Sequence, residues 1–256
     1  MTSEHVTLPL RLRALLFYLG MTLSTLVFGP LILLSFPLRF ERRYGVAKGW
    51  SGFNLRWLRW TCGIDYRVRG QENLPREPVI VLAKHQSTWE TIFLQWYLPP
   101  LAWVLKRELM WLPVFGWALA LMEPISIDRK ASSVAVAQIR NQGKRHLDNG
   151  RWVLIFPEGT RSAPGQRQRY KLGGARLAAY TGYPILPIAH NAGEFWPRRS
   201  FVKHPGTIDV VIGETMPTLG LDAQTINRQV EEWIEHAVAD LPRPTSGRTA
   251  ASRESA

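Results

Sequence analysis

The chain has 256 residues, of which 46% are hydrophobic, so it is long enough and apolar enough to form one sizeable domain with its own core. Its formal net charge of +12 predicts an anionic partner, such as nucleic acid, an acidic lipid surface or a phosphorylated substrate. The lone Cys62 excludes an internal disulfide and is typical of a protein from a reducing compartment.

The first predicted element is an uncharged, apolar stretch between Arg13 and Arg39. As a helix rising about 1.5 Å per residue, it is long enough to cross a hydrocarbon core of about 30 Å. Its length, and the lack of an A-x-A site after it, argue against a cleavable signal peptide. Gly29-Pro30 interrupts the stretch, which predicts either one kinked spanning helix or a helix–turn–helix that enters one leaflet and returns.

Basic residues are more frequent after this stretch than before it. They are Arg11 and Arg13 on the N-terminal side, and Arg39, Arg42, Arg43 and Lys48 on the C-terminal side. The excess predicts that the rest of the chain lies on the cytoplasmic side of an inner, cytoplasmic membrane.

Residues 49–63 place aromatic side chains at helical spacing beside two arginines, and the chain has 11 tryptophans, a residue type that favours membrane interfaces. The aromatic residues are Trp50, Phe53, Trp57 and Trp60. This pattern fits a helix lying among lipid headgroups and equally an amphipathic helix packed on a globular domain. We therefore divide the chain into a membrane-associated segment, 1–63, a catalytic domain, 64–240, and a disordered tail, 241–256.

From residue 64 onward, predicted strands and helices alternate. The strands lie near 65–70, 78–83, 102–106, 124–127, 152–157, 183–189 and 207–213, and the helices near 89–97, 112–121, 132–149, 173–182 and 222–240. This alternation predicts an α/β fold with a mixed, mostly parallel sheet flanked by helices. Ligand-binding sites in such folds lie at the carboxyl ends of the parallel strands.

The segment "KHQSTWET" follows the predicted strand 78–83 and carries His85 and Glu90. A structural interpretation makes Ser87 the N-cap of the next helix and Glu90 its capping-box partner. A functional interpretation places His85 on the strand-exit loop and Glu90 in the first helical turn, where the carboxylate fixes the imidazole tautomer and makes His85 a general base. The spacing does not match H-E-x-x-H, so no metal site is predicted.

A second loop, "FPEGTRS", follows the predicted strand 152–157. Backbone N–H groups around the turn at Gly159, with Arg161 beside them, would form a phosphate clamp, and Glu158 could hold Arg161 or a substrate hydroxyl. Lys171 precedes a predicted helix start, which is an anion-binding position. The alternative is a Pro/Gly turn with solvated basic residues. If both loops face one crevice, a base beside a phosphate clamp indicates transfer to a hydroxyl of a phosphorylated acceptor.

These motifs occur in the order found in a known family. The segments "GQENLP", "HQSTWE", "LKREL", "ISIDR", "FPEGTRS" and "YPILPIA" resemble those of the glycerophospholipid acyltransferases, and most closely the lysophosphatidic acid acyltransferases. The resemblance covers residues 64 to about 215. It implies transfer of an acyl group from acyl-CoA or acyl carrier protein to the sn-2 hydroxyl of lysophosphatidate, giving phosphatidate, with no bound cofactor.

The resemblance also implies roles for individual residues. His85 would be the general base, with Glu90 in the position where the family usually has Asp. Acceptor binding would fall to Glu158, Gly159, Thr160 and Arg161, helped by Lys106 and Arg129. Lys84 and Glu123-Pro124 depart from the family's usual Asn and Gly, which leaves another lysophospholipid or glycerol 3-phosphate open as acceptor.

The expected partners are a lysophospholipid, an acyl thioester donor and the bilayer. Nucleic acid is not expected, because the aromatic residues cluster beside the apolar stretch and no recognition motif is present. A non-enzymatic, basic membrane-binding protein is the alternative from a different functional class.

Overall fold

The computed structural model describes residues 8–128 and 132–243. At its centre is a seven-stranded sheet in the order β1-β7-β6-β2-β5-β3-β4. The strands are β1 (Ile64–Arg69), β2 (Ile80–Ala83), β3 (Leu101–Lys106), β4 (Ile125–Ile127), β5 (Trp152–Ile155), β6 (Ile185–His190) and β7 (Gly206–Ile212). Each lies within a residue or two of its predicted segment.

The sheet is mostly parallel, as predicted. Strand β2 pairs in parallel with both β5 and β6, and β5 continues in parallel through β3 to β4. Strand β7 pairs antiparallel with β6 and in parallel with β1, which lies at the edge of the sheet. The carboxyl ends of β2, β5 and β6 therefore meet at one edge of the sheet, where ligand sites form in this class of fold.

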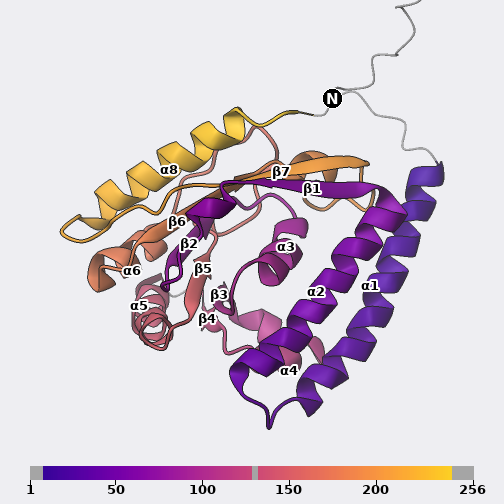
Figure 1. Ribbon diagram of the computed structural model, residues 1–256, viewed down its shortest axis with the longest axis horizontal. Helices are drawn as coiled ribbons and strands as arrows, with labels where there is room; N and C mark the ends of the chain where they lie inside the picture. The colour runs from indigo at the N-terminus through magenta and orange to yellow at the C-terminus, as the bar shows by residue number, and fades with distance from the viewer. Residues whose placement is uncertain (1–7, 129–131, 244–256) are drawn as a thin grey trace, which may run out of the picture.

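Helices cover both faces of the sheet (Figure 1). They are α1 (Leu8–Leu34), α2 (Phe40–Cys62), α3 (Trp89–Tyr97), α4 (Phe115–Ala120), α5 (Ser132–Asp148), α6 (Gly173–Thr181), α7 (Ala192–Phe195) and α8 (Ala223–Ala239). One apolar core joins the sheet to α2 and α3, and a second joins its other face to α5, α6 and α8. All residues of β2, β5 and β6 are buried between these layers.

The N-terminal helices form an antiparallel hairpin that lies along one side of the domain (Figure 1). Helix α1 continues through Pro30 to Leu34, so the turn comes at 35–39 and not at Gly29-Pro30. Gly20 allows the two helices to approach closely, because a Cβ there would lie 2.1 Å from the Trp57 indole nitrogen. That nitrogen instead donates to the Leu16 carbonyl at 3.1 Å.

The hairpin is fastened to the rest of the domain along its length. Helix α2 packs on α3 and places residues such as Tyr44 and Leu58 in the main core. In the first half of α1, the buried ammonium of Lys203 lies 3.7 Å from the ring centroid of Tyr18 and 4.5 Å from that of Trp196. Segment 49–63 therefore packs on the domain with one face, while Trp60 on its other face is exposed.

Three local features differ from the predictions. The helix expected at 112–121 is shorter: α4 runs only from Phe115 to Ala120, and a separate 3₁₀ turn, Arg107–Trp111, precedes it. The short helix α7 was not predicted. Leu241 is buried and the Pro242 carbonyl accepts from Asn191, so the first residues of the predicted tail pack on the domain, whereas 244–256 lie outside the described residues.

Candidate active site

His85 and Glu90 meet at the carboxyl end of β2. His85 lies on the loop that leaves the strand and Glu90 in the first turn of α3, as the functional interpretation required. The His85 Nδ1 atom is 2.8 Å from Glu90 Oε1. The imidazole stacks on Phe156, with ring centroids 4.0 Å apart, so the ring plane is fixed from a second side.

Glu90 also performs the structural role that the sequence offered as the alternative. Its carboxylate accepts from the backbone N–H of Gln86 at 2.9 Å and of Ser87 at 2.8 Å. The N-cap of α3 is Thr88 and not the predicted Ser87, but the buried Ser87 hydroxyl accepts from the Trp89 N–H at 3.2 Å and so satisfies the first N–H of the helix. One carboxylate therefore caps the start of α3 and holds the imidazole.

The environment of Glu90 favours its charged form. The side chain is fully buried, which by itself raises its pKa. The hydrogen bonds that the carboxylate makes with the His85 ring and accepts from the Ser87 N–H outweigh this effect, and the pKa of Glu90 lies below its ordinary value. A carboxylate in this state orients the His85 ring with Nδ1–H as donor and leaves Nε2 as the basic nitrogen.

His190, the last residue of β6, contacts the backbone of the same loop. Its Nε2 lies 2.8 Å from the Lys84 carbonyl and 4.0 Å from Glu90 Oε2, and its Nδ1 accepts from the Ala192 N–H. Burial lowers the pKa of His190, which favours the neutral ring that this hydrogen-bond pattern requires. Sequence reasoning missed His190, although a polar residue directly after an apolar strand was an available signal.

The second predicted loop, after β5, binds the backbone of His85 on both sides. Glu158 Oε1 accepts from the His85 N–H at 2.8 Å, and the Ser162 N–H donates to the His85 carbonyl at 2.8 Å. The Glu158 side chain is fully buried, and its Oε1 holds the backbone of His85. The two loops thus form one unit because β2 and β5 are neighbours.

Gly159 occupies a conformation that favours glycine, with φ of 69°. A Cβ at this position would lie 2.8 Å from the Lys171 ammonium nitrogen, so the Lys171 side chain covers the turn. The Lys171 N–H donates to the Pro157 carbonyl at 2.8 Å. The structure therefore brings the predicted anion-binding lysine to the glycine turn.

Thr160 and Arg161 lie at the outer side of this turn, where Thr160 is exposed and Arg161 is partly exposed. The Arg198 guanidinium donates to the Arg161 carbonyl at 2.7 Å and adds a second positive charge beside it. Arg198 comes from the loop that follows α7, and its contribution could not be inferred from the sequence.

The remaining predicted residues lie farther along the same edge. Lys106 ends β3 in a partly exposed ion pair with Glu108 at 3.0 Å. Arg129 lies outside the described residues. Glu123, at the position where the family often has glycine, adopts a positive φ of 49° and forms an ion pair with Arg43 at 2.8 Å.

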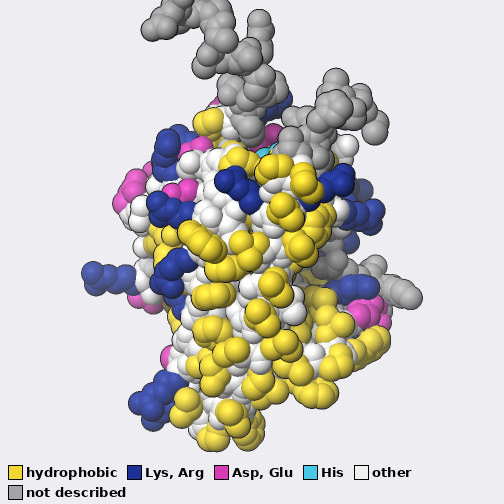
Figure 2. All heavy atoms as spheres, turned by 90° about the vertical axis from the view of Figure 1, so that its right-hand side faces the viewer, with side chains coloured by type: hydrophobic (Ala, Val, Ile, Leu, Met, Phe, Trp, Pro, Cys, Tyr) yellow, Lys and Arg dark blue, Asp and Glu magenta, His cyan; other side chains and the backbone are white. Residues whose placement is uncertain are grey.

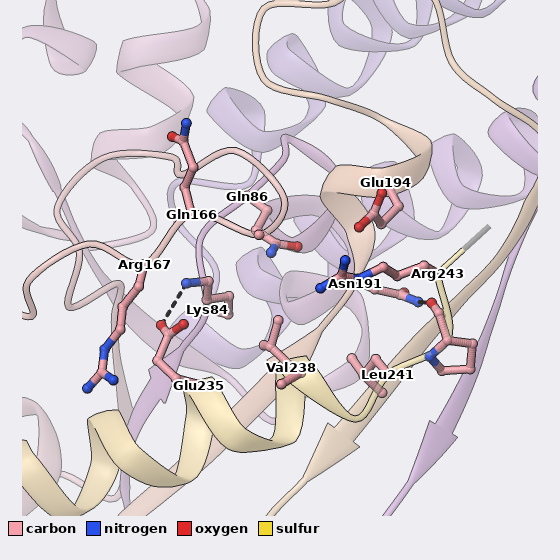
Figure 3. Close-up of a pocket in the computed structure, with 13 residues that line it drawn as sticks. Lys84, Gln86, Gln166, Arg167, Asn191, Glu194, Glu235, Val238, Leu241 and Arg243 are labelled. Atoms are coloured by element: carbon pink, nitrogen blue, oxygen red, sulfur yellow. Dashed lines mark hydrogen bonds and ion pairs between the residues drawn. The ribbon is translucent and has the colours of Figure 1, made fainter. Parts of the chain in front are cut away.

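Next to His85 in the chain, Lys84 is buried under α8. Its ammonium lies 2.7 Å from Glu235 Oε1, as the dashed line in Figure 3 shows, and 3.5 Å from Glu158 Oε2. A cavity of about 140 Å³ lies beside this pair and includes Asn191 and Glu194 in its lining. Glu235 could not be predicted as the partner of Lys84, because it is 151 residues away in the chain.

Comparison with known proteins defines the class of this fold and site. Residues 65–191, which include both loops, match the family model described as Acyltransferase. A solved structure titled as the 1-acyl-sn-glycerophosphate (LPA) acyltransferase PlsC from Thermotoga maritima has the same fold, with a TM-score of 0.76 at 24% identity over 92% of this chain and 97% of that one.

Curated relatives are more specific. A 1-acyl-sn-glycerol-3-phosphate acyltransferase from Pseudomonas aeruginosa is 47% identical over 90% of this chain and 91% of its own length. One from Saccharomyces cerevisiae is 34% identical over 70% of this chain and 60% of its own length. The chain belongs to the 1-acyl-sn-glycerol-3-phosphate acyltransferase family. It is therefore an enzyme, and the non-enzymatic alternative is set aside.

Proposed function

We propose that this acyltransferase moves an acyl group from acyl-CoA or acyl carrier protein to the sn-2 hydroxyl of lysophosphatidate, giving phosphatidate. His85 is the general base and Glu90 orients it. The observation that carries the proposal is the 2.8 Å contact between His85 Nδ1 and Glu90 Oε1 in a buried setting. The relatives named above support the choice of acceptor.

The proposed reaction needs one proton acceptor and no covalent intermediate on the protein. The acceptor hydroxyl gives its proton to His85 Nε2 as its oxygen attacks the thioester carbonyl. Glu90 stabilises the imidazolium that forms. The tetrahedral intermediate then expels the thiolate, which takes the proton from His85. Ser87 is buried and its hydroxyl caps α3, which supports a structural role and not a nucleophilic one.

Acceptor binding is assigned to the loop after β5. Arg161 follows Gly159 in the loop and the Lys171 side chain lies against Gly159, so two cationic groups at this turn could bind one phosphate. Two hydrogen bonds keep this turn at a fixed position relative to the base: the His85 N–H donates to the Glu158 carboxylate, and the Ser162 N–H donates to the His85 carbonyl. Such a geometry holds a phosphorylated alcohol by its phosphate while its hydroxyl faces the imidazole.

The hairpin supports a membrane location. Helix α1 is, by length and composition, long and apolar enough to cross a bilayer. Its exposed side chains form a continuous apolar face (Figure 2). That face includes Leu12, Leu15, Leu19, Leu23, Leu26 and Leu31.

We infer that this face enters one leaflet and does not span the bilayer. Helix α1 packs along α2, and α2 packs on α3 of the catalytic domain. A spanning α1 would pull the charged residues of α2, including Arg42, Arg56 and Arg59, into hydrocarbon, where each costs about 2.5–3.5 kcal/mol. Insertion of the exposed face alone leaves these charges at the surface, and the net charge of +12 favours anionic headgroups.

The decisive experiment measures products with the purified enzyme in anionic vesicles. Lysophosphatidate, other lysophospholipids and glycerol 3-phosphate are each offered with palmitoyl-CoA or palmitoyl carrier protein. Thiol release and lipid mass spectrometry report the reaction. We expect phosphatidate from lysophosphatidate, and no thiol release without acceptor. Efficient acylation of another acceptor with none of lysophosphatidate would contradict the assignment.

A further inference from the structure

Lys84 is an unusual residue to find directly before a catalytic histidine. Its side chain is 1% exposed and is among the largest fully buried side chains of the described chain. Desolvation of an ammonium group costs several kcal/mol unless a counter-charge lies beside it. Glu235 Oε1, at 2.7 Å, supplies that charge, and the Tyr170 hydroxyl donates to the same oxygen at 2.9 Å.

A chain of contacts leads from this ion pair to the base. The Lys84 ammonium is also 3.5 Å from Glu158 Oε2, and Oε1 of the same carboxylate accepts from the His85 N–H at 2.8 Å. Burial raises the pKa of Glu158, and the Lys84 charge is the largest opposing influence. Lys84 therefore favours the charged, hydrogen-bonding form of the group that fixes the His85 backbone.

Glu235 belongs to a different part of the chain from the rest of the site. It lies on α8, whereas the acyltransferase family model matches residues 65–191 only. Helix α8 packs on the face of the sheet opposite α3, with Ile226, Val230 and Ile234 buried. Glu235 is one position beyond this apolar stripe, so the helix presents its carboxylate to the strand end (Figure 3).

We infer that Lys84 and Glu235 are positioning residues for acyl transfer. The Glu235 carboxylate holds the Lys84 ammonium against Glu158, and Glu158 holds the backbone of His85, so that α8 sets the place of the catalytic imidazole. This inference rests on the proposed function of His85. It extends the working site to α8, which lies outside the residues that the family model matches.

The test compares Glu235→Gln and Lys84→Met with the wild-type enzyme, in vesicles, as turnover per folded molecule. We expect kcat to fall by about ten- to a hundredfold in each variant, because small displacements of a base have effects of this size. The KM for lysophosphatidate should stay within about twofold. The double variant should be no slower than the slower single variant, since the two residues act as one unit.

Glu231→Gln is the matched control. Glu231 lies one turn earlier on α8 and pairs with Arg167 at 2.9 Å, at a partly exposed site. Its loss removes an ion pair from the same helix without reaching Lys84, so kcat should not change. Glu235 is 15% exposed and glutamine has its shape, so this variant should fold even if Lys84→Met does not.

The outcomes distinguish the positioning role of Lys84 and Glu235 from the proposed function of the enzyme. Wild-type kcat in folded Glu235→Gln, with only a lower melting temperature, would overturn the positioning role while leaving the proposed function in place, provided that His85→Ala is inactive. A fall in kcat equal to that of Glu231→Gln would also overturn it. An inactive wild-type enzyme would instead contradict the proposed function.

Discussion

The two loops at the carboxyl ends of β2 and β5 differ in how far their polar side chains are buried. In the first, Glu90 is fully buried and its carboxylate is hydrogen-bonded to His85, Gln86 and Ser87. In the second, Glu158 turns inward to His85, whereas Thr160 and Arg161 face outward. The first loop fixes the His85 side chain through Glu90. The second combines a buried carboxylate, Glu158, with an accessible guanidinium, Arg161. Substitutions in the first should therefore change kcat, and outward-facing substitutions in the second should change KM.

The largest effect is expected for His85→Ala. Without the imidazole no group accepts the hydroxyl proton, so kcat should fall by about 10⁴-fold. The ring is on the rim of the core, so the circular dichroism spectrum and vesicle binding should match the wild type. Substantial remaining turnover, measured as thiol release, would show that another base operates.

Glu90→Gln should come next. A glutamine has one acceptor oxygen where the carboxylate has two, and its NH₂ group would face the Ser87 N–H that Oε2 now accepts at 3.0 Å. We expect kcat to fall by about 10²-fold and stability at pH 7 to fall by about 1–3 kcal/mol. Capping-box reasoning alone predicts almost no change in stability, so urea unfolding tests the tertiary contribution.

The pH dependence of that stability loss follows from the direction of the pKa shift. The pKa of Glu90 in the folded protein lies below its ordinary 4.5. Its stabilising contribution is therefore complete above 4.5 and is lost as the pH falls through the folded value. The difference between the wild type and Glu90→Gln should shrink in acid, and a difference that grows below pH 4.5 would contradict this assignment.

Arg161→Ala, an outward-facing substitution in the second loop, should change KM more than kcat. Loss of a charge-assisted contact to phosphate should raise the KM for lysophosphatidate by about tenfold or more, with a smaller change in kcat. Arg69→Ala is the control, because Arg69 is exposed at the end of β1, which runs opposite to β2. Equal KM values for Arg161→Ala and Arg69→Ala would remove Arg161 from the acceptor site.

The smallest effect is expected for Leu19→Asp on the exposed face of α1. Loss of one inserted leucine, about 1.5–3 kcal/mol, should weaken vesicle binding by at least about tenfold without changing the melting temperature. Val134→Asp places the same charge at an exposed apolar position on α5. Co-sedimentation with anionic vesicles that responds equally to both variants would argue against a lipid-facing α1.

Strand and helix order were predictable because they depend on local pattern. The run 78–83 and the spacing from His85 to Glu90 predicted a strand, a loop and a helix start, and β2 and α3 confirm this order. The turn of the N-terminal hairpin was not predictable from Gly29-Pro30. Helix α1 stays intact past Pro30 to Leu34 while it packs on α2, and the turn comes at 35–39.

The sequence by itself determined the family, the α/β order of elements and the residue types at the two strand ends, because these follow from contiguous motifs and periodicity. Only the tertiary structure decided which groups surround His85. Glu158, His190 and Glu235 are 73, 105 and 150 residues away from it in the chain, and a carboxylate or imidazole has no local signature for a partner so distant. Sheet order brings them together, since parallel neighbours of β2 end at one edge and α8 closes over it.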